Sequence, residues 1–190
     1  LKEMDTQYVA TMLEEMYTDD AVDILNDLDN KERESYLEMM DSETADEINE
    51  LLSYAEYTAG AIMTTEYVSI LESSTVRSAM AVMRKEAPTA ETIYYIFVVN
   101  DEHQLTGVMS LRDLIIADED ALICDIMSER VVSVQLTTDQ EEAAQIMKDY
   151  NFLALPVTNE TGVLQGIITV DDIIDVIEEE ASDDYSKLAG

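Results

Sequence analysis

The sequence has few basic residues to balance its acidic ones. Ten Lys and Arg accompany 43 Asp and Glu, which gives a formal net charge of -33. Proteins that bind nucleic acids neutralise phosphates with Lys and Arg, so we expect no nucleic-acid partner. Adsorption to an anionic membrane surface is disfavoured for the same reason. Metal cations are the natural counter-charge of such a chain.

Other absences narrow the function further. The single cysteine, Cys124, excludes an internal disulfide, and the single histidine, His103, excludes a site built from several imidazoles. No apolar run is long enough to span a bilayer, so we expect no direct membrane insertion of this segment. The sequence has no G-x-S-x-G motif and no glycine-rich phosphate loop of the usual spacing. We therefore do not expect an enzyme.

The first 57 residues predict a small all-helical domain. They contain neither glycine nor proline, and their apolar residues recur at helical spacing. A stripe of large side chains recurs every four residues, at Met4, Tyr8, Met12 and Met16. We predict that this stripe packs in the core. Thr18 is the expected N-cap of the second helix, and Asp41 or Ser42 that of the last one.

The rest of the chain contains an internal repeat. Ile62-Met63-Thr64 is echoed by Ile126-Met127-Ser128, and Gly107 is echoed by Gly166. The first spacing is 64 residues and the second is 59, so the first copy is five residues longer, most simply at 87–91. Each copy predicts a strand, a helix, a β-hairpin and a final helix. The expected fold class is α+β, with the two β-α-β-β-α units packed about a pseudo-two-fold axis.

Several segments resemble one family. Residues 107–113 and 166–172, GVMSLRD and GIITVDD, are similar to the corresponding part of CBS domains. Residues 57–64, 91–96 and 169–181 resemble the cytosolic part of MgtE-type magnesium transporters, in which a helical N domain precedes a tandem pair of CBS domains. The resemblance implies an N domain at 1–57 and CBS domains at 58–125 and 126–182. It also implies that residues 183–190 begin a connecting helix to a membrane pore domain that this chain lacks.

Carboxylates on the second predicted helix are the first candidate metal ligands. Asp19, Asp23 and Asp27 lie at i, i+4 and i+8, and therefore on one helix face. From spacing alone they are either a solvated face or a cation site, since hard cations such as Mg²⁺ prefer oxygen ligands. The resemblance implies metal binding for Asp19 and Asp23.

The last predicted helix is the second candidate. Asp172, Asp175 and Glu179 lie at i, i+3 and i+7, and the dense negative charge toward the helix C-terminus opposes the macrodipole. Negative charge that opposes the helix dipole indicates either a functional site or a run of solvated charged residues. The resemblance implies Mg²⁺ binding by Asp172, Asp175, Glu180 and Asp183.

Three further positions match metal positions of the family. Glu141 is one, although Thr138-Asp139-Gln140-Glu141 also reads as a capping box, which explains it without metal. Asn151 stands where the family commonly has Asp, so it offers an oxygen without charge. Ala61 stands in a pair where the family often has two glycines, and it offers only its backbone carbonyl.

Two hydroxyl–carboxylate pairs, Ser110 with Asp113 and Thr169 with Asp172, have two interpretations. Each is a helix cap. In many CBS pairs the same residues hold the ribose and phosphate of ATP or AMP.

Together these features predict a Mg²⁺-sensing regulatory module at the cytoplasmic face of a membrane. The resemblance implies that it works as a homodimer through its CBS domains and gates a magnesium pore. An adenine-nucleotide sensor and a passive dimerisation scaffold are the alternatives.

Overall fold

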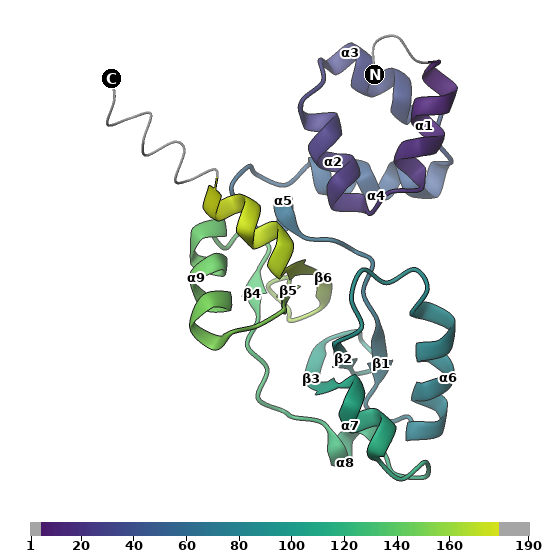
Figure 1. The fold of residues 1–190 in the computed structure, drawn as a ribbon, viewed down its shortest axis with the longest axis vertical. Helices are drawn as coiled ribbons and strands as arrows, with labels where there is room; N and C mark the ends of the chain where they lie inside the picture. The colour runs from purple at the N-terminus through teal and green to yellow at the C-terminus, as the bar shows by residue number, and fades with distance from the viewer. Residues whose placement is uncertain (1–4, 179–190) are drawn as a thin grey trace.

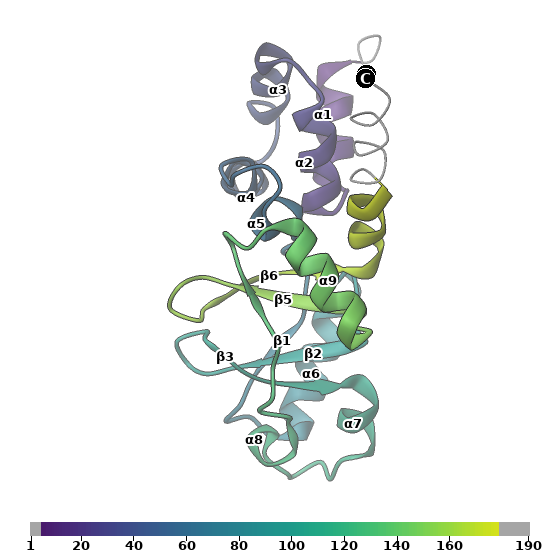
Figure 2. The same ribbon diagram turned by 90° about the vertical axis from the view of Figure 1, so that its left-hand side faces the viewer.

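The computed structural model describes residues 5–178 and places three parts along its long axis (Figure 1). A helical domain lies at one end, the second repeat lies in the middle, and the first repeat lies at the other end (Figure 2). No helix in residues 5–178 is both long enough and apolar enough to cross a membrane. The predicted connecting helix at 183–190 lies outside the described residues.

The helical domain contains four short helices. They are α1 (Thr6–Glu14), α2 (Thr18–Asn26), α3 (Asn30–Leu37) and α4 (Ser42–Leu52). Aspartates cap three of them, because a carboxylate accepts hydrogen bonds from the unpaired N–H groups of the first turn. Asp41 accepts from the N–H groups of Glu43 and Thr44, which confirms one of the two expected caps of α4.

The predicted core stripe is wrong for Tyr8 and Met12, which are 58% and 39% exposed. Met16 packs against the core as predicted, and Met4 lies outside the described residues. The buried face of α1 is formed by Val9, Ala10 and Leu13. Small and branched side chains on that face let α1 approach its neighbours closely.

Each repeat forms a three-stranded sheet. The first comprises β1 (Ser69–Leu71), α6 (Val76–Glu86), β2 (Tyr95–Val99), β3 (Leu105–Ser110) and α7 (Leu111–Ile116). The second comprises β4 (Val134–Gln135), α9 (Gln140–Tyr150), β5 (Ala154–Thr158), β6 (Leu164–Thr169) and a helix at 170–178. In both sheets the first strand is parallel to the second, and the second and third form an antiparallel hairpin. Short helices precede each repeat, α5 (Ala59–Ile62) and α8 (Ile123–Ile126).

The five-residue difference between the repeats lies where the glycine spacing predicts it. Residues 87–94 connect α6 to β2, whereas residues 151–153 connect α9 to β5. The longer connection in the first repeat leaves room for a loop beside the helical domain. This loop carries Glu91.

The repeats exchange their leading segments. Thr64, which precedes the first sheet, forms a bridge with Ile167 in β6, and Ser128, which precedes the second, forms a bridge with Val108 in β3. The leading segment of the first repeat passes close to the hairpin of the second. A Cβ at Gly166 would lie 2.7 Å from the Sδ atom of Met63 and from the carbonyl oxygen of Thr64. Only glycine fits there, which explains the glycine shared by the two hairpins.

The helical domain docks on the second repeat through a shared core. Buried residues of α1, α2 and α4 belong to the same apolar cluster as those of α5, α9 and β5. The core of the first repeat is a separate cluster. The helical domain and the second repeat are therefore one packed unit.

A glutamate of the first repeat caps α2. The predicted N-cap role of Thr18 is wrong, because Thr18 is the first helical residue and Tyr17 occupies the cap position without a side-chain hydrogen bond. Glu66 substitutes for the missing cap. Its carboxylate accepts hydrogen bonds from the Thr18 N–H at 3.2 Å and from the Thr18 hydroxyl at 2.8 Å. Thr18 is buried by this contact.

Replacing Glu66 by alanine is expected to loosen the start of α2. The Thr18 N–H loses its acceptor, and a buried donor left unpaired costs about 1–3 kcal/mol. Hydrogen exchange of the Thr18 amide should become faster, and the free energy of unfolding in urea should fall by about that amount. The Glu56→Ala variant removes an exposed carboxylate of the connection and should change neither quantity. Unchanged Thr18 exchange in Glu66→Ala would contradict the cap.

Candidate metal centre

Four of the predicted metal ligands gather in one cavity. The cavity has a volume of about 430 Å³ and lies between α2, the helix at 170–178 and the start of α9. Asp19, Asp23, Asp172 and Asp175 line it, as their helical spacing predicts. The remaining lining residues are Ile24, Asn26, Asp27, Ile62, Gln140 and Val176. None of these is basic, so the described lining supplies no positive charge.

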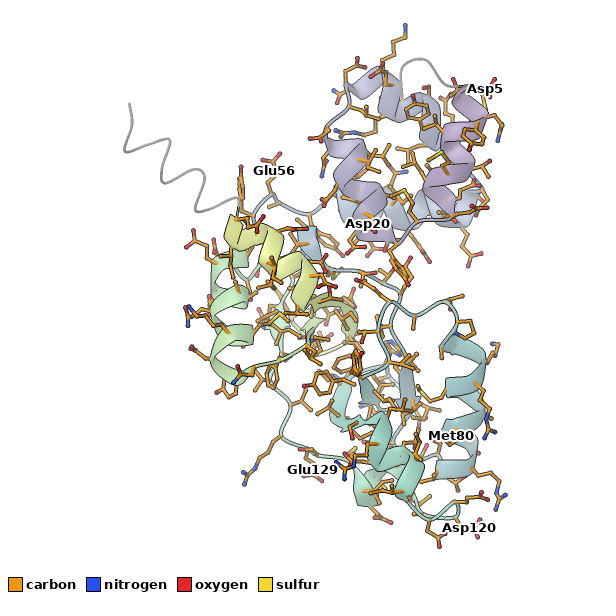
Figure 3. The ribbon with its side chains drawn as sticks, viewed as in Figure 1. Asp5, Asp20, Glu56, Met80, Asp120 and Glu129 are labelled. Atoms are coloured by element: carbon orange, nitrogen blue, oxygen red, sulfur yellow. The ribbon has the colours of Figure 1, made fainter. Side chains whose placement is uncertain are left out.

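The orientation of α2 brings these side chains together. The end of α2 near Asp20 faces the two repeats (Figure 3). The Glu66 cap holds that end, and the buried residues Val22 and Leu25 attach the adjoining face of the helix to the core. The face that carries Asp19 and Asp23 is therefore turned toward the helix at 170–178.

Three carboxylates form a tighter cluster beside the cavity. Asp19, Glu91 and Asp172 each offer an oxygen atom, and the three atoms lie within 4.8 Å of one another. Asp19 is only 7% exposed. Its Oδ1 atom and the Oε2 atom of Glu91 are buried and have no hydrogen-bond partner within residues 5–178. Buried polar atoms are nearly always paired, so two unpaired anionic oxygens at one place indicate a missing partner.

Burial perturbs the acidity of all three groups. Burial, followed by repulsion from Asp172 and Glu91, raises the pKa of Asp19 to about 8. Burial, followed by repulsion from Asp172, raises the pKa of Glu91 to about 7. Burial also raises the pKa of Asp172, against hydrogen bonds from Thr169 that favour its anion. Removal from water disfavours each charged form, and a nearby cation would restore it.

The donor set suits a hard divalent cation. Carboxylate oxygens, with the amide oxygens of Asn26 and Gln140 nearby, are ligands of the kind that Mg²⁺ and Ca²⁺ take. Mg²⁺ also keeps several water molecules, for which a cavity of this volume has room. The arrangement fits cation binding.

The other predicted metal positions are more dispersed. Ala61 lies on α5 next to Ile62, which lines the cavity. Glu141 lines a separate cavity between α9 and the helix at 170–178, with Lys148. Asn151 is exposed at the opposite end of α9, where it adopts a left-handed conformation with φ of 53° as the C-cap. Glu180 and Asp183 lie outside the described residues.

The capping-box explanation of Glu141 is wrong. Asp139, not Thr138, is the N-cap of α9, and its carboxylate accepts the N–H of Glu141 itself. The hydroxyl of Thr138 instead accepts the N–H of Gln135. The capping box therefore does not account for Glu141, and its metal role stays a prediction.

The two hydroxyl–carboxylate pairs form as predicted for caps. Ser110 and Asp113 make a reciprocal capping box at α7. Thr169 donates its hydroxyl to Asp172 at 2.6 Å. These contacts need no ligand, and nucleotide binding by the four residues stays a prediction.

Sequence reasoning missed Glu91 as a site residue. Its place in the five-residue insertion was visible, but nothing in the local pattern distinguishes it from the other acidic residues. Only the folded loop shows that it reaches Asp19 and Asp172. Asn26 and Gln140 were missed for the same reason.

Comparisons with known proteins agree with this architecture. The MgtE intracellular N domain matches residues 1–57, and the CBS domain matches residues 59–120 and 123–179. The magnesium transporter MgtE of Enterococcus faecalis is 61% identical over 149 residues, which cover 78% of this chain and 33% of that protein. The magnesium transporter MgtE of Thermus thermophilus is 47% identical over 174 residues, which cover 90% of this chain and 38% of that protein. The chain thus spans between a third and two fifths of these relatives.

Solved structures show the same likeness. The crystal structure of the soluble part of a magnesium transporter has a TM-score of 0.92 and 58% identity, and covers 95% of this chain and 70% of that chain. The cytosolic domain of the Mg²⁺ channel MgtE in complex with ATP has a TM-score of 0.89 and 44% identity, and covers 93% of this chain and 72% of that chain. The expected fold class is confirmed, and the relatives named here are magnesium transporters and a Mg²⁺ channel rather than enzymes. The chain belongs to the MgtE family and consists of its intracellular N domain followed by a tandem pair of CBS domains.

Proposed function

We propose that this chain is the Mg²⁺-sensing regulatory part of a magnesium channel or transporter, held at the cytoplasmic face of the cell membrane. The observation that carries the proposal is the buried carboxylate of Asp19, which has an unpaired oxygen and faces Asp172 across the boundary between the N domain and the second CBS repeat. The named relatives are magnesium transporters, which supports Mg²⁺ as the cation.

The mechanism follows from the charge. Asp19 and Asp23 belong to the N domain, whereas Asp172 and Asp175 belong to the second CBS repeat. With Mg²⁺ between them the carboxylates are neutralised and the domains pack closely. Without it the two negative faces repel, the N domain moves away, and the terminal helix of the chain is released. In the full protein this release would open the pore, since the cation favours the compact state.

A homodimer is the proposed form of the module. α7 exposes Ile115 and Ile116 beside the exposed Tyr94, and together they line an apolar groove of about 420 Å³. The second repeat exposes Leu153 and Ile174 at the equivalent positions. Two related apolar patches, one on each repeat of the pair, suit a two-fold contact between copies.

An adenine nucleotide is the second candidate ligand. A cavity of about 70 Å³ between the two sheets is lined by Tyr95, Phe152 and Arg130, among others. Aromatic rings can stack on a base, and a guanidinium can meet phosphate. Tyr95 pairs in register with Ser110, and this proximity of Ser110 to the cavity supports the second candidate. A related cytosolic domain is known in complex with ATP.

The Asp175→Asn variant tests the cation site. Asp175 is exposed and lines the cavity, so its loss should leave the fold intact and remove one ligand charge. The affinity for Mg²⁺, measured by titration calorimetry, should fall about tenfold, which corresponds to about 1.4 kcal/mol. Millimolar Mg²⁺ should raise the melting temperature of the wild type beyond a control of matched ionic strength, by mass action.

The matched control is Asp171→Asn. Asp171 is an exposed neighbour on the same helix and does not line the cavity, so the affinity should not change. If Mg²⁺ and monovalent salt gave the same melting temperature, Mg²⁺ would act only by screening the acidic residues, and the proposal would be wrong. Stabilisation by ATP or AMP without metal would favour the second candidate.

The increase in melting temperature caused by Mg²⁺ should depend on pH. Asp19 and Glu91 have pKa values of about 8 and 7 in the folded protein, far above those of free carboxyls. The folded state then binds protons more tightly than the unfolded state, so the metal-free protein should lose stability as the pH rises from about 4 to about 8. Mg²⁺ competes with these protons, and its effect on melting should therefore be larger at pH 8 than at pH 5.5. In Asp19→Asn this difference should shrink, and in Asp46→Asn, a surface control on α4, it should persist.

The Ile115→Asp variant tests the dimer. A charge on the apolar patch should convert a particle of twice 21.3 kDa into a monomer in sedimentation equilibrium at micromolar concentration. The Val82→Asp variant adds the same charge to α6, outside the groove, and should remain dimeric. A monomeric wild type would refute the proposed contact.

A further inference from the structure

The inserted loop of the first CBS repeat reaches into the boundary between the other two parts. Residues 87–94 form this loop, which is five residues longer than its counterpart in the second repeat. The backbone N–H of Glu91 donates to the carbonyl oxygen of Glu66 at 2.8 Å. Glu66 in turn caps the start of α2. The loop is therefore fixed to the residue that holds the N domain in place.

The carboxylate of Glu91 points at a place where two other domains present their own carboxylates. Its Oε2 atom is buried and unpaired within the described chain, and so is Oδ1 of Asp19, whose side chain is more than nine-tenths buried. Asp172 completes the set, with one oxygen from each residue inside 4.8 Å. Asp19 comes from the N domain, Glu91 from the first repeat and Asp172 from the second repeat.

We propose that Glu91 is a ligand of a divalent cation held between Asp19 and Asp172, so that one ion joins the N domain to both CBS repeats. This inference rests on the proposed function and adds to it the first repeat as a direct participant. The cluster shares Asp19 and Asp172 with the neighbouring cavity, where Asp23, Asp27 and Asp175 offer further carboxylates, but Glu91 does not line that cavity.

The spacing of the oxygens fits a bound cation. Oδ1 of Asp19 and Oε2 of Glu91 accept no hydrogen bond from a donor in the described part of the chain, and a cation would be the partner that both oxygens lack. Mg²⁺ binds oxygen at about 2.1 Å, which holds adjacent ligands about 3 Å apart and opposite ligands about 4.2 Å apart. Oxygens within 4.8 Å of one another need only a small closure to reach this geometry.

The proposal predicts two classes of affinity. One buried and two half-buried carboxylates attract a cation more strongly than exposed ones, because burial weakens the screening of charge by water. The cluster of Asp19, Glu91 and Asp172 should fill first, and the exposed carboxylates of the cavity should fill at higher Mg²⁺ concentration. The first event fixes the three parts relative to one another.

The test is the isosteric Glu91→Gln variant of the full chain, titrated with Mg²⁺ alone. The tighter binding event should weaken at least tenfold, and the weaker events should keep their affinity. Glu72→Gln, a half-buried glutamate of the same repeat outside the cluster, is the matched control and should bind as the wild type does.

Melting separates a ligand from a structural residue. Above about pH 8 and without metal, Glu91→Gln should melt at a higher temperature than the wild type, because it removes one of three ionised carboxylates that repel one another. With saturating Mg²⁺ the order should reverse, because the variant binds the ion less tightly. A residue needed only for packing would lower the melting temperature under both conditions, and that result would overturn the inference.

A second variant separates this inference from the proposed function. Asp19→Asn removes a ligand that both require. If Asp19→Asn weakens Mg²⁺ binding and Glu91→Gln does not, Glu91 is no ligand and the sensing function stands. If neither variant alters Mg²⁺ binding, both the inference and the cation site at this boundary fail.

Discussion

Repulsion between carboxylates at the meeting point of three domains is the interaction on which the rest of the structure depends. Asp19, Glu91 and Asp172 approach within 4.8 Å in a chain of net charge -33. Once the pH is high enough to ionise these carboxyls, two unit charges 4 Å apart repel each other by about 4 kcal/mol at an effective dielectric constant of 20. Apolar packing between the N domain and the second repeat holds the boundary closed against this repulsion. Neutralising the carboxylates therefore shifts the balance toward the docked state.

The contacts at this boundary divide into two kinds. The shared apolar core and the Glu66 cap of α2 need no ion, and they define how the N domain docks. The carboxylates make docking depend on the cation. A ligand shifts the equilibrium between the docked and undocked states only by the difference in its affinity for them. Asp19 and Asp172 belong to separate domains, so an undocked N domain leaves the site incomplete. A cation that binds to both Asp19 and Asp172 therefore favours the docked state.

Local and periodic features were predictable from the sequence, and tertiary ones were not. The spacing of the glycines located the repeat and its insertion, and helical spacing placed Asp19 and Asp23 on the face that lines the cavity. The same periodicity failed for Tyr8, because it cannot tell which of two adjacent stripes a helix buries. Glu66 and Glu91 act across domain boundaries, and no local pattern encodes a partner that lies more than 40 residues away in the chain.

The site depends on a departure from the repeat symmetry. Asp113 and Asp172 are equivalent positions, and each accepts a hydrogen bond from the hydroxyl that precedes it by three residues. Asp113 lies on α7, far from the N domain, and is exposed (Figure 2). Asp172 lies beneath α2 and meets the loop that only the first repeat has inserted. Two similar units therefore supply different parts of one boundary, a helix carboxylate from one and a loop carboxylate from the other. A strictly symmetric pair would offer the N domain only one of them.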